Sequence, residues 1–460
     1  LGLIPTFSSQ TACFRGGAMD ASSYRRLVKA LEGVFFIVAL IGGAVIFLSA
    51  GYIARSWLQV AQLPVAQVQK AIQLMSLIIA LRWLCGLYRG QISGFEKLVW
   101  LGWYNASIAT LRFVGAWLVL MLIGVTPVIF FSYQLMVAVL ELSGVIIYAY
   151  RLLPGIPEGK HLAWSWKPLK PMLNFSLTLA LASLAWVAVT QTDKLVLSKF
   201  LPLGQYGYFT LAVLAAGCVM MIGEAVSGAI MPRMVKLESE NNQIDLIRVY
   251  RWSTQLVAVI AGAIAVTLAF NAESLLWVWT GDRILAHQAS PILVLYVIGN
   301  GILAVSAFPY YLQYAKGDLR FHLAGSIMFV ILLIPALIWA VGRYGGVGAG
   351  YAWLIVNLLF LAGWTPWVHR KFAPALNQKW YFQDVAAIFT VTALTGFGLH
   401  FIFTPSGYNR GWAFLAIAGF GFLVMLAGIG SSSVARAKLK MLFAREIKGR
   451  RRLDAGSRKN

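Results

Sequence analysis

The sequence predicts an all-α protein built from about twelve transmembrane helices. Of its 460 residues, 60% are apolar and 12% are charged, whereas soluble globular domains have about 45 to 50% apolar and about 25% charged residues. This composition excludes a soluble globular protein. Two further observations, the apolar stretches and the placement of positive charge, define the expected helices and their orientation.

Twelve apolar stretches lie between glycine, proline or charged residues. Each is long enough for a helix that crosses a bilayer core of about 30 Å, which takes about 20 residues. The expected spans cover residues 33–56, 68–91, 99–123, 127–151, 171–198, 205–233, 250–279, 291–316, 320–342, 346–370, 384–404 and 412–433.

Positive charge is distributed unevenly between these spans. Of the 38 lysines and arginines, 29 fall in the N-terminal segment, alternate connections and the tail, six fall in the other connections, and Lys70, Arg82 and Arg112 fall inside spans. Cytoplasmic loops carry the excess of such residues, so we expect both ends of the chain in the cytoplasm. We expect the net charge of +22 to interact with the anionic headgroups of membrane lipids, and we expect no nucleic-acid partner.

An internal repeat is indicated when the sequence is shifted by 222 residues. Arg26 and Trp57 then coincide with Arg248 and Trp279, and a second basic residue follows three positions after each arginine. A parallel repeat of six helices would produce this pattern, and it implies that the first two helices of the N-terminal lobe are missing from this chain. The expected organisation is an N-terminal lobe of four helices (1–151), a six-helix C-terminal lobe (171–370), two additional helices (384–433) and a basic tail (434–460).

Two arginines inside spans are the candidate substrate-binding residues. Arg82 is expected about 14 Å from the cytoplasmic end of its span, and Arg112 lies near the midplane. A guanidinium offers a two-pronged hydrogen-bonding group to phosphate oxygens and keeps its charge at any depth. The alternative is that both arginines pair with Glu141 and only fix helix packing, since ions inside membranes commonly pair with one another.

Four residues are candidates for ion coupling or gating: Glu141, Asp193, Lys194 and Glu224. Burial favours reversible protonation of Glu224, and the alternative is a hydrogen bond to Ser227 or to another helix. Asp193 and Lys194 are consecutive, about 100° apart on a helix, and are therefore expected to engage different partners near the outer rim of a cavity. For Lys194 the alternative is snorkelling to the membrane interface.

Enzyme and cofactor chemistry finds no support in the sequence. The five histidines show no paired ligand spacing and no P-loop occurs, so we expect no metal site, no cofactor and no catalytic residue. The three cysteines are far apart in sequence, which leaves no disulfide framework.

Two stretches resemble the polysaccharide (O-antigen type) flippases of the multidrug/oligosaccharidyl-lipid/polysaccharide exporter superfamily. Residues 191–199 (QTDKLVLSK), with 203–204 and 206–209, are similar to the start of that family's second lobe. Residues 1–6 and 20–32 are similar to the segment after its second helix.

This resemblance implies a bacterial inner-membrane transporter that flips undecaprenyl-pyrophosphate-linked oligosaccharide, an intermediate of polysaccharides such as O-antigen and lipopolysaccharide, to the periplasmic leaflet by alternating access. It also implies polysaccharide polymerase and assembly proteins as partners. The alternatives are a drug/cation antiporter of the same superfamily, a membrane-embedded polysaccharide-assembly enzyme, and a scaffold. Two deep arginines speak against an organic-cation cavity, and the short outer connections speak against an enzyme.

Overall fold

The computed structural model describes residues 3–15, 19–60, 63–155, 184, 187–374, 376–402 and 409–436. These residues form helices and turns and contain no β-strand, which confirms the predicted fold class. The chain divides into two compact units, unit 1 with residues 1–188 and unit 2 with residues 189–460. The predicted domain boundaries and the 222-residue repeat stay predictions.

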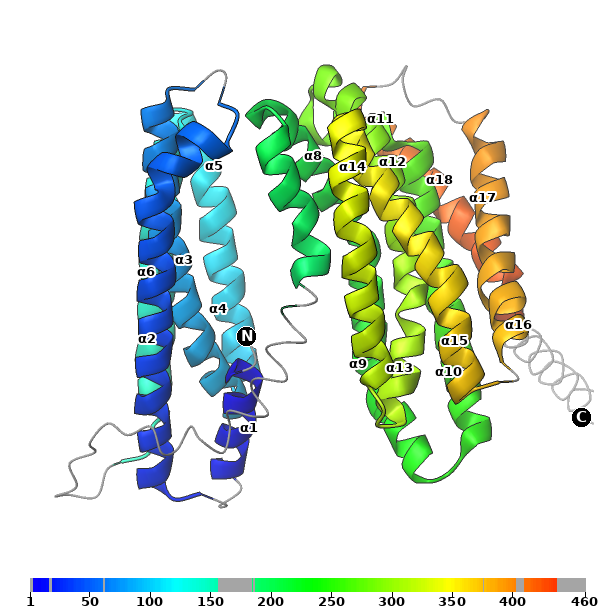
Figure 1. Ribbon diagram of the computed structural model, residues 1–460, viewed down its shortest axis with the longest axis horizontal. Helices are drawn as coiled ribbons and strands as arrows, with labels where there is room; N and C mark the ends of the chain where they lie inside the picture. The colour runs from blue at the N-terminus through cyan, green and yellow to red at the C-terminus, as the bar shows by residue number, and fades with distance from the viewer. Residues whose placement is uncertain are drawn as a thin grey trace, which may run out of the picture. The chain divides into compact units, whose positions relative to one another are not determined.

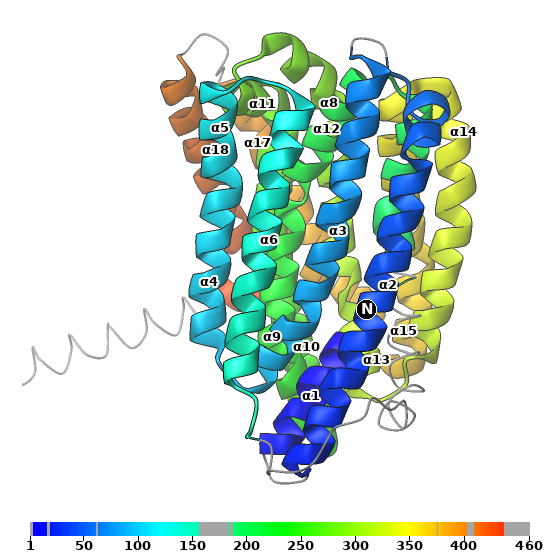
Figure 2. The same cartoon turned by 90° about the vertical axis from the view of Figure 1, so that its left-hand side faces the viewer.

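Unit 1 is organised around α3 (Val65–Gly94), which packs against α2 on one side and α6 on the other (Figures 1 and 2). Its buried cluster includes Tyr24, Phe35 and Cys85. The other helices of this unit are α1 (Leu3–Arg15), α2 (Ala21–Tyr52), α4 (Leu98–Thr110), α5 (Ala116–Leu122) and α6 (Pro127–Arg151), with two π-helical turns, η1 (Ile53–Trp57) and η2 (Leu111–Gly115).

Unit 2 is organised around α10 (Gln243–Phe270) and α12 (Arg283–Ser306), which pack against each other. The last two helices, α17 and α18, both pack on α10 and so belong to this unit. Residues 187–200 are helical. The remaining elements are α8 (Leu203–Ala216), α9 (Cys218–Ser239), α11 (Ala272–Thr280), α13 (Phe308–Ala315), α14 (Arg320–Leu359), η4 (Phe360–Trp364), α15 (Thr365–Phe372), α16 (Asn377–Lys379), η5 (Trp380–Ala386), α17 (Ala387–His400) and α18 (Arg410–Ser431).

Ten helical segments of the described chain are long and apolar enough to cross a membrane. One of them, Arg320–Phe372, contains two predicted spans, 320–342 and 346–370. Gly345 separates them with φ +56° and ψ −137°, a conformation that glycine adopts at little cost because it has no Cβ. The predicted span 171–198 lies largely outside the described residues.

Several helices begin earlier than the apolar stretches predict. The expected starts at residues 33, 250 and 291 were wrong, because α2, α10 and α12 begin at Ala21, Gln243 and Arg283. In each case a polar side chain caps the first turn by accepting hydrogen bonds from backbone N–H groups. These caps are Asp20, Asn242 and Asp282.

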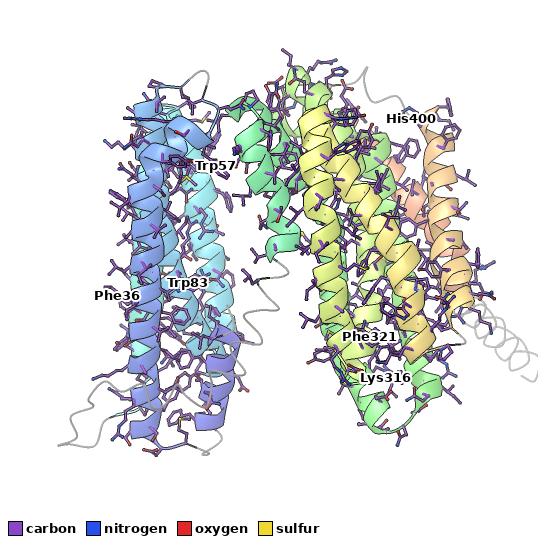
Figure 3. All side chains as sticks on the ribbon, in the orientation of Figure 1. Phe36, Trp57, Trp83, Lys316, Phe321 and His400 are labelled. Carbon is purple, nitrogen blue, oxygen red and sulfur yellow. The ribbon has the colours of Figure 1, made fainter. Side chains whose placement is uncertain are left out.

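Apolar side chains cover the outside of the spans, as a lipid-facing surface requires. Phe36 on α2 is 58% exposed and lies on the outward side of that helix (Figure 3). Inside unit 2, a side chain at Gly350 would place its Cβ 2.8 Å from Leu295. The role of this glycine is therefore to let α14 approach α12 closely.

Candidate functional site

Three arginines surround the carboxylate of Glu141 in unit 1. Arg89 Nη2 lies 2.5 Å from Oε1, Arg112 Nη2 lies 2.9 Å from Oε2, and Arg82 Nε lies 3.6 Å from Oε2. Arg82 and Arg89 come from α3, Arg112 from η2, and Glu141 from the middle of α6. We call these four residues the arginine cluster.

Gln134, two turns before Glu141 on α6, ties the arginine cluster together. Its Oε1 accepts a hydrogen bond from Arg82 Nη2 at 3.2 Å, and its Nε2 donates to the backbone carbonyl of Arg112 at 3.0 Å. The amide therefore orients one arginine side chain and holds the backbone of another. Because Gln134 is only 6% exposed, these contacts lie inside the unit.

The π-helical turn η2 sets the position of Arg112. Such turns are frequent at functional sites. In a π-helical turn the backbone hydrogen bonds depart from the regular α-helical pattern, so some carbonyl groups need other donors. Here α6 supplies donors to two of them: Tyr133 Oη donates to Leu111 O at 2.8 Å, and Gln134 donates to Arg112 O. The ring of Tyr133 occupies the space that a side chain at residue 115 would need, which accounts for Gly115 at the end of η2.

The arginine cluster carries more positive charge than its single carboxylate can neutralise. Glu141 is 1% exposed at its side chain, whereas the three arginine side chains are 27 to 35% exposed. A guanidinium has five N–H donors, yet the buried Nε atoms of all three arginines have no hydrogen-bond partner among the described residues. Unused donors and an excess of two positive charges, held within membrane-spanning helices, form a site suited to an anion.

The contact of Arg82 and Arg112 with Glu141, expected as the alternative to ligand binding, is present. What the sequence analysis missed is Arg89, which it assigned to a cytoplasmic connection. Residue 89 lies in α3, which continues to Gly94, so Arg89 is held by the same helix as Arg82. The signal was available: Arg89 follows Arg82 by seven residues, two helical turns, and therefore lies on the same face.

Asp193 and Lys194 engage different partners, as expected, but their side chains also contact each other, which was not expected. Lys194 Nζ lies 3.5 Å from Asp193 Oδ1 and donates to the carbonyl of Thr190 at 2.8 Å. The long lysine side chain folds back along its own helix and so reaches Asp193, although the two side chains leave the helix in different directions. Asp193 is 3% exposed and accepts a hydrogen bond from Tyr296 Oη at 2.7 Å.

The remaining predicted residue, Glu224, lies in α9. Its side chain and that of Ser227 are outside the described part of the structure, so the proposed protonation and its alternative both stay predictions. Among the described residues, no group of three or more histidine, cysteine, aspartate or glutamate side chains could hold a metal ion.

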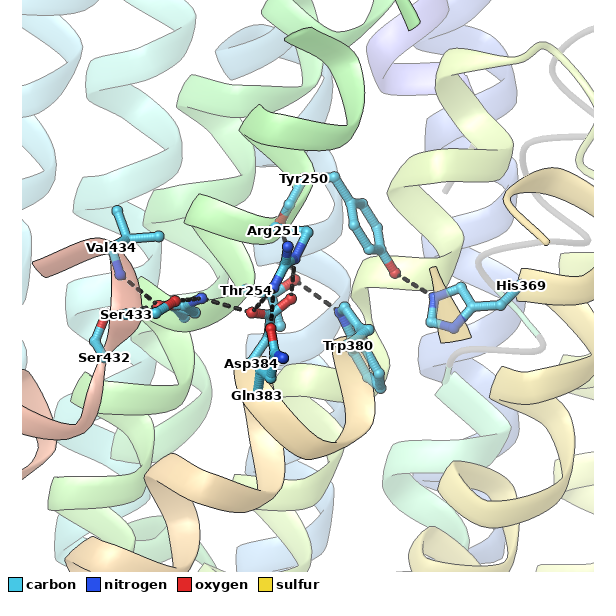
Figure 4. Close-up of polar contacts among 11 residues, drawn as sticks. Tyr250, Arg251, Thr254, His369, Trp380, Gln383, Asp384, Ser432, Ser433 and Val434 are labelled. Atoms are coloured by element: carbon cyan, nitrogen blue, oxygen red, sulfur yellow. Dashed lines mark hydrogen bonds and ion pairs between the residues drawn. The ribbon is translucent and has the colours of Figure 1, made fainter. Parts of the chain in front are cut away.

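Unit 2 holds a second charged contact of a different kind (Figure 4). Arg251 binds both oxygens of Asp384 through Nε at 2.6 Å and Nη2 at 2.8 Å. Gln255 donates to Asp384 Oδ1 at 2.5 Å and to Ser433 Oγ at 2.9 Å. One guanidinium faces one fully buried carboxylate, so this contact is balanced in charge and joins α10 to η5 and to the segment after α18.

Two solved structures, of a flippase and of a transporter, have a fold similar to that of this chain. The solved structure of the lipid II flippase MurJ in an inward closed conformation matches with a TM-score of 0.68 and 14% identity, over 97% of this chain and 90% of that one. An outward-facing multidrug resistance MATE transporter of the MOP superfamily matches with a TM-score of 0.51 and 16% identity, over 82% and 84%. No curated protein matches the sequence.

The chain thus has the fold of membrane flippases and transporters, and the expected resemblance is confirmed. The family model described as "Polysaccharide biosynthesis protein" matches residues 29–287. This range includes the whole arginine cluster and more than half of the chain, and the protein belongs to that family of polysaccharide biosynthesis proteins.

Proposed function

We propose that the protein flips a lipid-linked oligosaccharide, carried on undecaprenyl pyrophosphate, from the cytoplasmic to the periplasmic leaflet of the bacterial inner membrane by alternating access. Its family and its fold support a polysaccharide transporter. The observation that carries the choice of substrate is the arginine cluster, where Arg82, Arg89 and Arg112 share the one carboxylate of Glu141. A polyprenyl pyrophosphate brings a compact, multiply charged anion into the membrane together with an apolar tail.

In this proposal Glu141 positions the arginines, and the pyrophosphate completes their charge balance. With Glu141 alone, the excess positive charge has no counter-ion within the described part of unit 1. Each uncompensated charge at the centre of a span costs about 2.5 to 3.5 kcal/mol on insertion scales. A pyrophosphate would offset that cost and engage the unused N–H donors through paired hydrogen bonds. The ion-coupling or gating roles of Glu141, Asp193, Lys194 and Glu224 stay predictions.

A drug/cation antiporter is the alternative function, favoured only by the likeness to the MATE transporter. An organic cation requires carboxylates and aromatic faces in its cavity. The arginine cluster would repel it. A cation site, if present, must therefore lie elsewhere than at these four residues.

The test uses the full chain in a bacterium that depends on it for surface polysaccharide. Three variants each replace one arginine of the cluster: Arg82→Ala, Arg89→Ala and Arg112→Ala. Each leaves Glu141 paired with the two other arginines and lowers the excess positive charge, so protein levels should stay normal. Surface polysaccharide should nevertheless be lost, and the corresponding lysine variants should recover part of it by restoring charge without the planar fork. Lys70→Gln is the matched control, because it removes one exposed positive charge from the same helix α3.

Normal surface polysaccharide in all three alanine variants would exclude the ligand-binding role. A loss of polysaccharide that merely follows a loss of protein would assign the arginines to packing. Normal protein with no polysaccharide, together with an unaffected Lys70→Gln variant, is the outcome that the proposal requires.

Orientation is tested separately with reporters. From the charge distribution we expect a reporter fused after Gly430 to lie in the cytoplasm and one inserted near Asp282 to lie in the periplasm. Both reporters on the same side of the membrane would overturn the proposed topology, with no bearing on the arginine cluster.

A further inference from the structure

A pocket of about 580 Å³ lies in unit 2, and no residue of the arginine cluster lines it. It is formed by the end of α9, the first turns of α10 and the short segment after α18, and three of its lining residues are Arg233, Arg248 and Arg251. No carboxylate is among its described lining residues. The turn between α9 and α10 lies at the same end of unit 2 as Lys316 and Phe321, whereas His400 lies at the opposite end (Figures 1 and 3).

The three arginines are not equally engaged. Arg251 is held by Asp384, and Arg248 Nη1 contacts Asp245 Oδ1 at 2.5 Å while its side chain stays 73% exposed. Arg233 is exposed and makes no hydrogen bond or ion pair with another described residue. Arg233 therefore has no partner in the described part of the chain, and all three guanidinium groups have N–H donors to spare.

Apolar side chains line the same pocket beside the arginines. Ile244, Ile247 and Trp252 are among its lining residues, and Ile244 is 76% exposed while Trp252 is 40% exposed. An amphipathic pocket at the end of membrane-spanning helices, lined by arginines and by apolar side chains, matches a phosphate headgroup with its acyl chains. Basic pockets between transmembrane helices are where anionic lipid headgroups bind.

We propose that this pocket binds one anionic phospholipid, with its phosphate at Arg233 and Arg248 and an acyl chain along Ile244 and Trp252. Binding would stabilise the ends of α9 and α10 where they leave the membrane.

The experiment titrates the purified full chain with short-chain phosphatidylglycerol and counts the retained lipids by native mass spectrometry. Phosphatidylcholine, inorganic phosphate and a polyprenyl pyrophosphate are titrated in parallel. We expect one phosphatidylglycerol to be retained in preference to phosphatidylcholine. The variants Arg233→Gln and Arg248→Gln should each weaken its apparent affinity about fivefold, and Arg343→Gln, an exposed arginine of α14 outside the pocket, should have no effect.

A second variant keeps the arginines unchanged. Ile244→Glu places a carboxylate among the apolar lining residues, and it should reduce phosphatidylglycerol retention at least as strongly as Arg233→Gln. Equal retention of the two phospholipids, or retention unchanged by Arg233→Gln and Ile244→Glu, would overturn the proposal. So would two other results: inorganic phosphate competing as well as the lipid, which assigns a free-anion site, or preferential binding of the polyprenyl pyrophosphate, which assigns the pocket to the substrate path.

Discussion

In unit 1, three arginines share the carboxylate of Glu141, whereas in unit 2 Arg251 faces Asp384 with one guanidinium for one carboxylate. Both carboxylates are buried, and both contacts join helices that are far apart in sequence. Only the contact in unit 2 is balanced in charge. There Gln255 and the segment after α18 complete its hydrogen bonds, while buried arginine nitrogens in unit 1 lack partners among the described residues.

The spans that carry the two contacts are buried to different extents. In the apolar part of α10, 67% of the residues are buried, and in that of Asn377–His400, 28%. The corresponding shares in unit 1 are 39% for α3, 11% for Leu98–Leu122 and 28% for α6. The pair in unit 2 is therefore anchored on one well-buried helix, whereas none of the helices of the arginine cluster is as deeply buried, which suits a site that a ligand completes.

The largest expected effect comes from Glu141→Gln, which leaves three arginines inside the membrane without a carboxylate. At about 2.5 to 3.5 kcal/mol for each uncompensated charge, the level of inserted protein should fall about tenfold or more, as measured by immunoblotting of membrane fractions. Adding Arg89→Gln should recover part of that loss. A Glu141→Gln protein that inserts as well as the wild type would show that the excess charge is neutralised in another way.

In unit 2, Arg251→Ala should destabilise the folded protein by about 3 to 5 kcal/mol, because Asp384 would stay buried without its partner. Thermal unfolding in detergent measures this change. Replacing both members, with Arg251→Met and Asp384→Leu, should restore most of the stability. If Arg251→Ala alone unfolds at the wild-type temperature, the pair has no structural role and the contrast between the units fails.

Arg89→Gln sharpens the comparison because it removes one arginine where two others remain. Glu141 keeps Arg82 and Arg112 as partners, so thermal stability should change by less than about 1 kcal/mol, well below the effect of Arg251→Ala. The same detergent assay compares the two variants directly. Equal destabilisation by both would mean that the third arginine is as necessary for packing as the only arginine of the balanced pair.

The smallest effect concerns the N-terminal cap of α2 in unit 1. Hydrogen bonds from Ser22 and Ser23 lower the pKa of Asp20 from its ordinary value near 3.8. Because the folded-state pKa is depressed, the cap contributes its stability above the ordinary pKa and loses it as the pH falls through the folded value.

Amide hydrogen exchange at Ser23, corrected for intrinsic rates, should therefore show wild-type protection at neutral pH and its loss in strong acid. The variant Asp20→Asn accepts the same backbone hydrogen bond without titrating, and its protection should not depend on pH. Acid loss of the same size in both proteins would show that another group controls this end of unit 1.

Hydropathy and charge alone predict the main features of the chain: an all-helical membrane protein, most of its spans, and the glutamate and two of the three arginines that form its candidate site. These features are local, since an apolar stretch of sufficient length must become a helix in a bilayer whatever surrounds it. Helix starts were less predictable, because the polar first turns capped by Asp20, Asn242 and Asp282 carry no apolar signal.

Tertiary structure decided which charged residues meet. Arg89 became the third arginine at Glu141 only because the faces of α3 and α6 pack together, and Asp384 became the partner of Arg251 only because η5 packs on α10. Likewise, Tyr296 of α12 holds one carboxylate oxygen of Asp193 while Lys194 contacts the other. The choice among partners depends on helix packing and side-chain reach in three dimensions, and the spacing of residues along one helix contains neither.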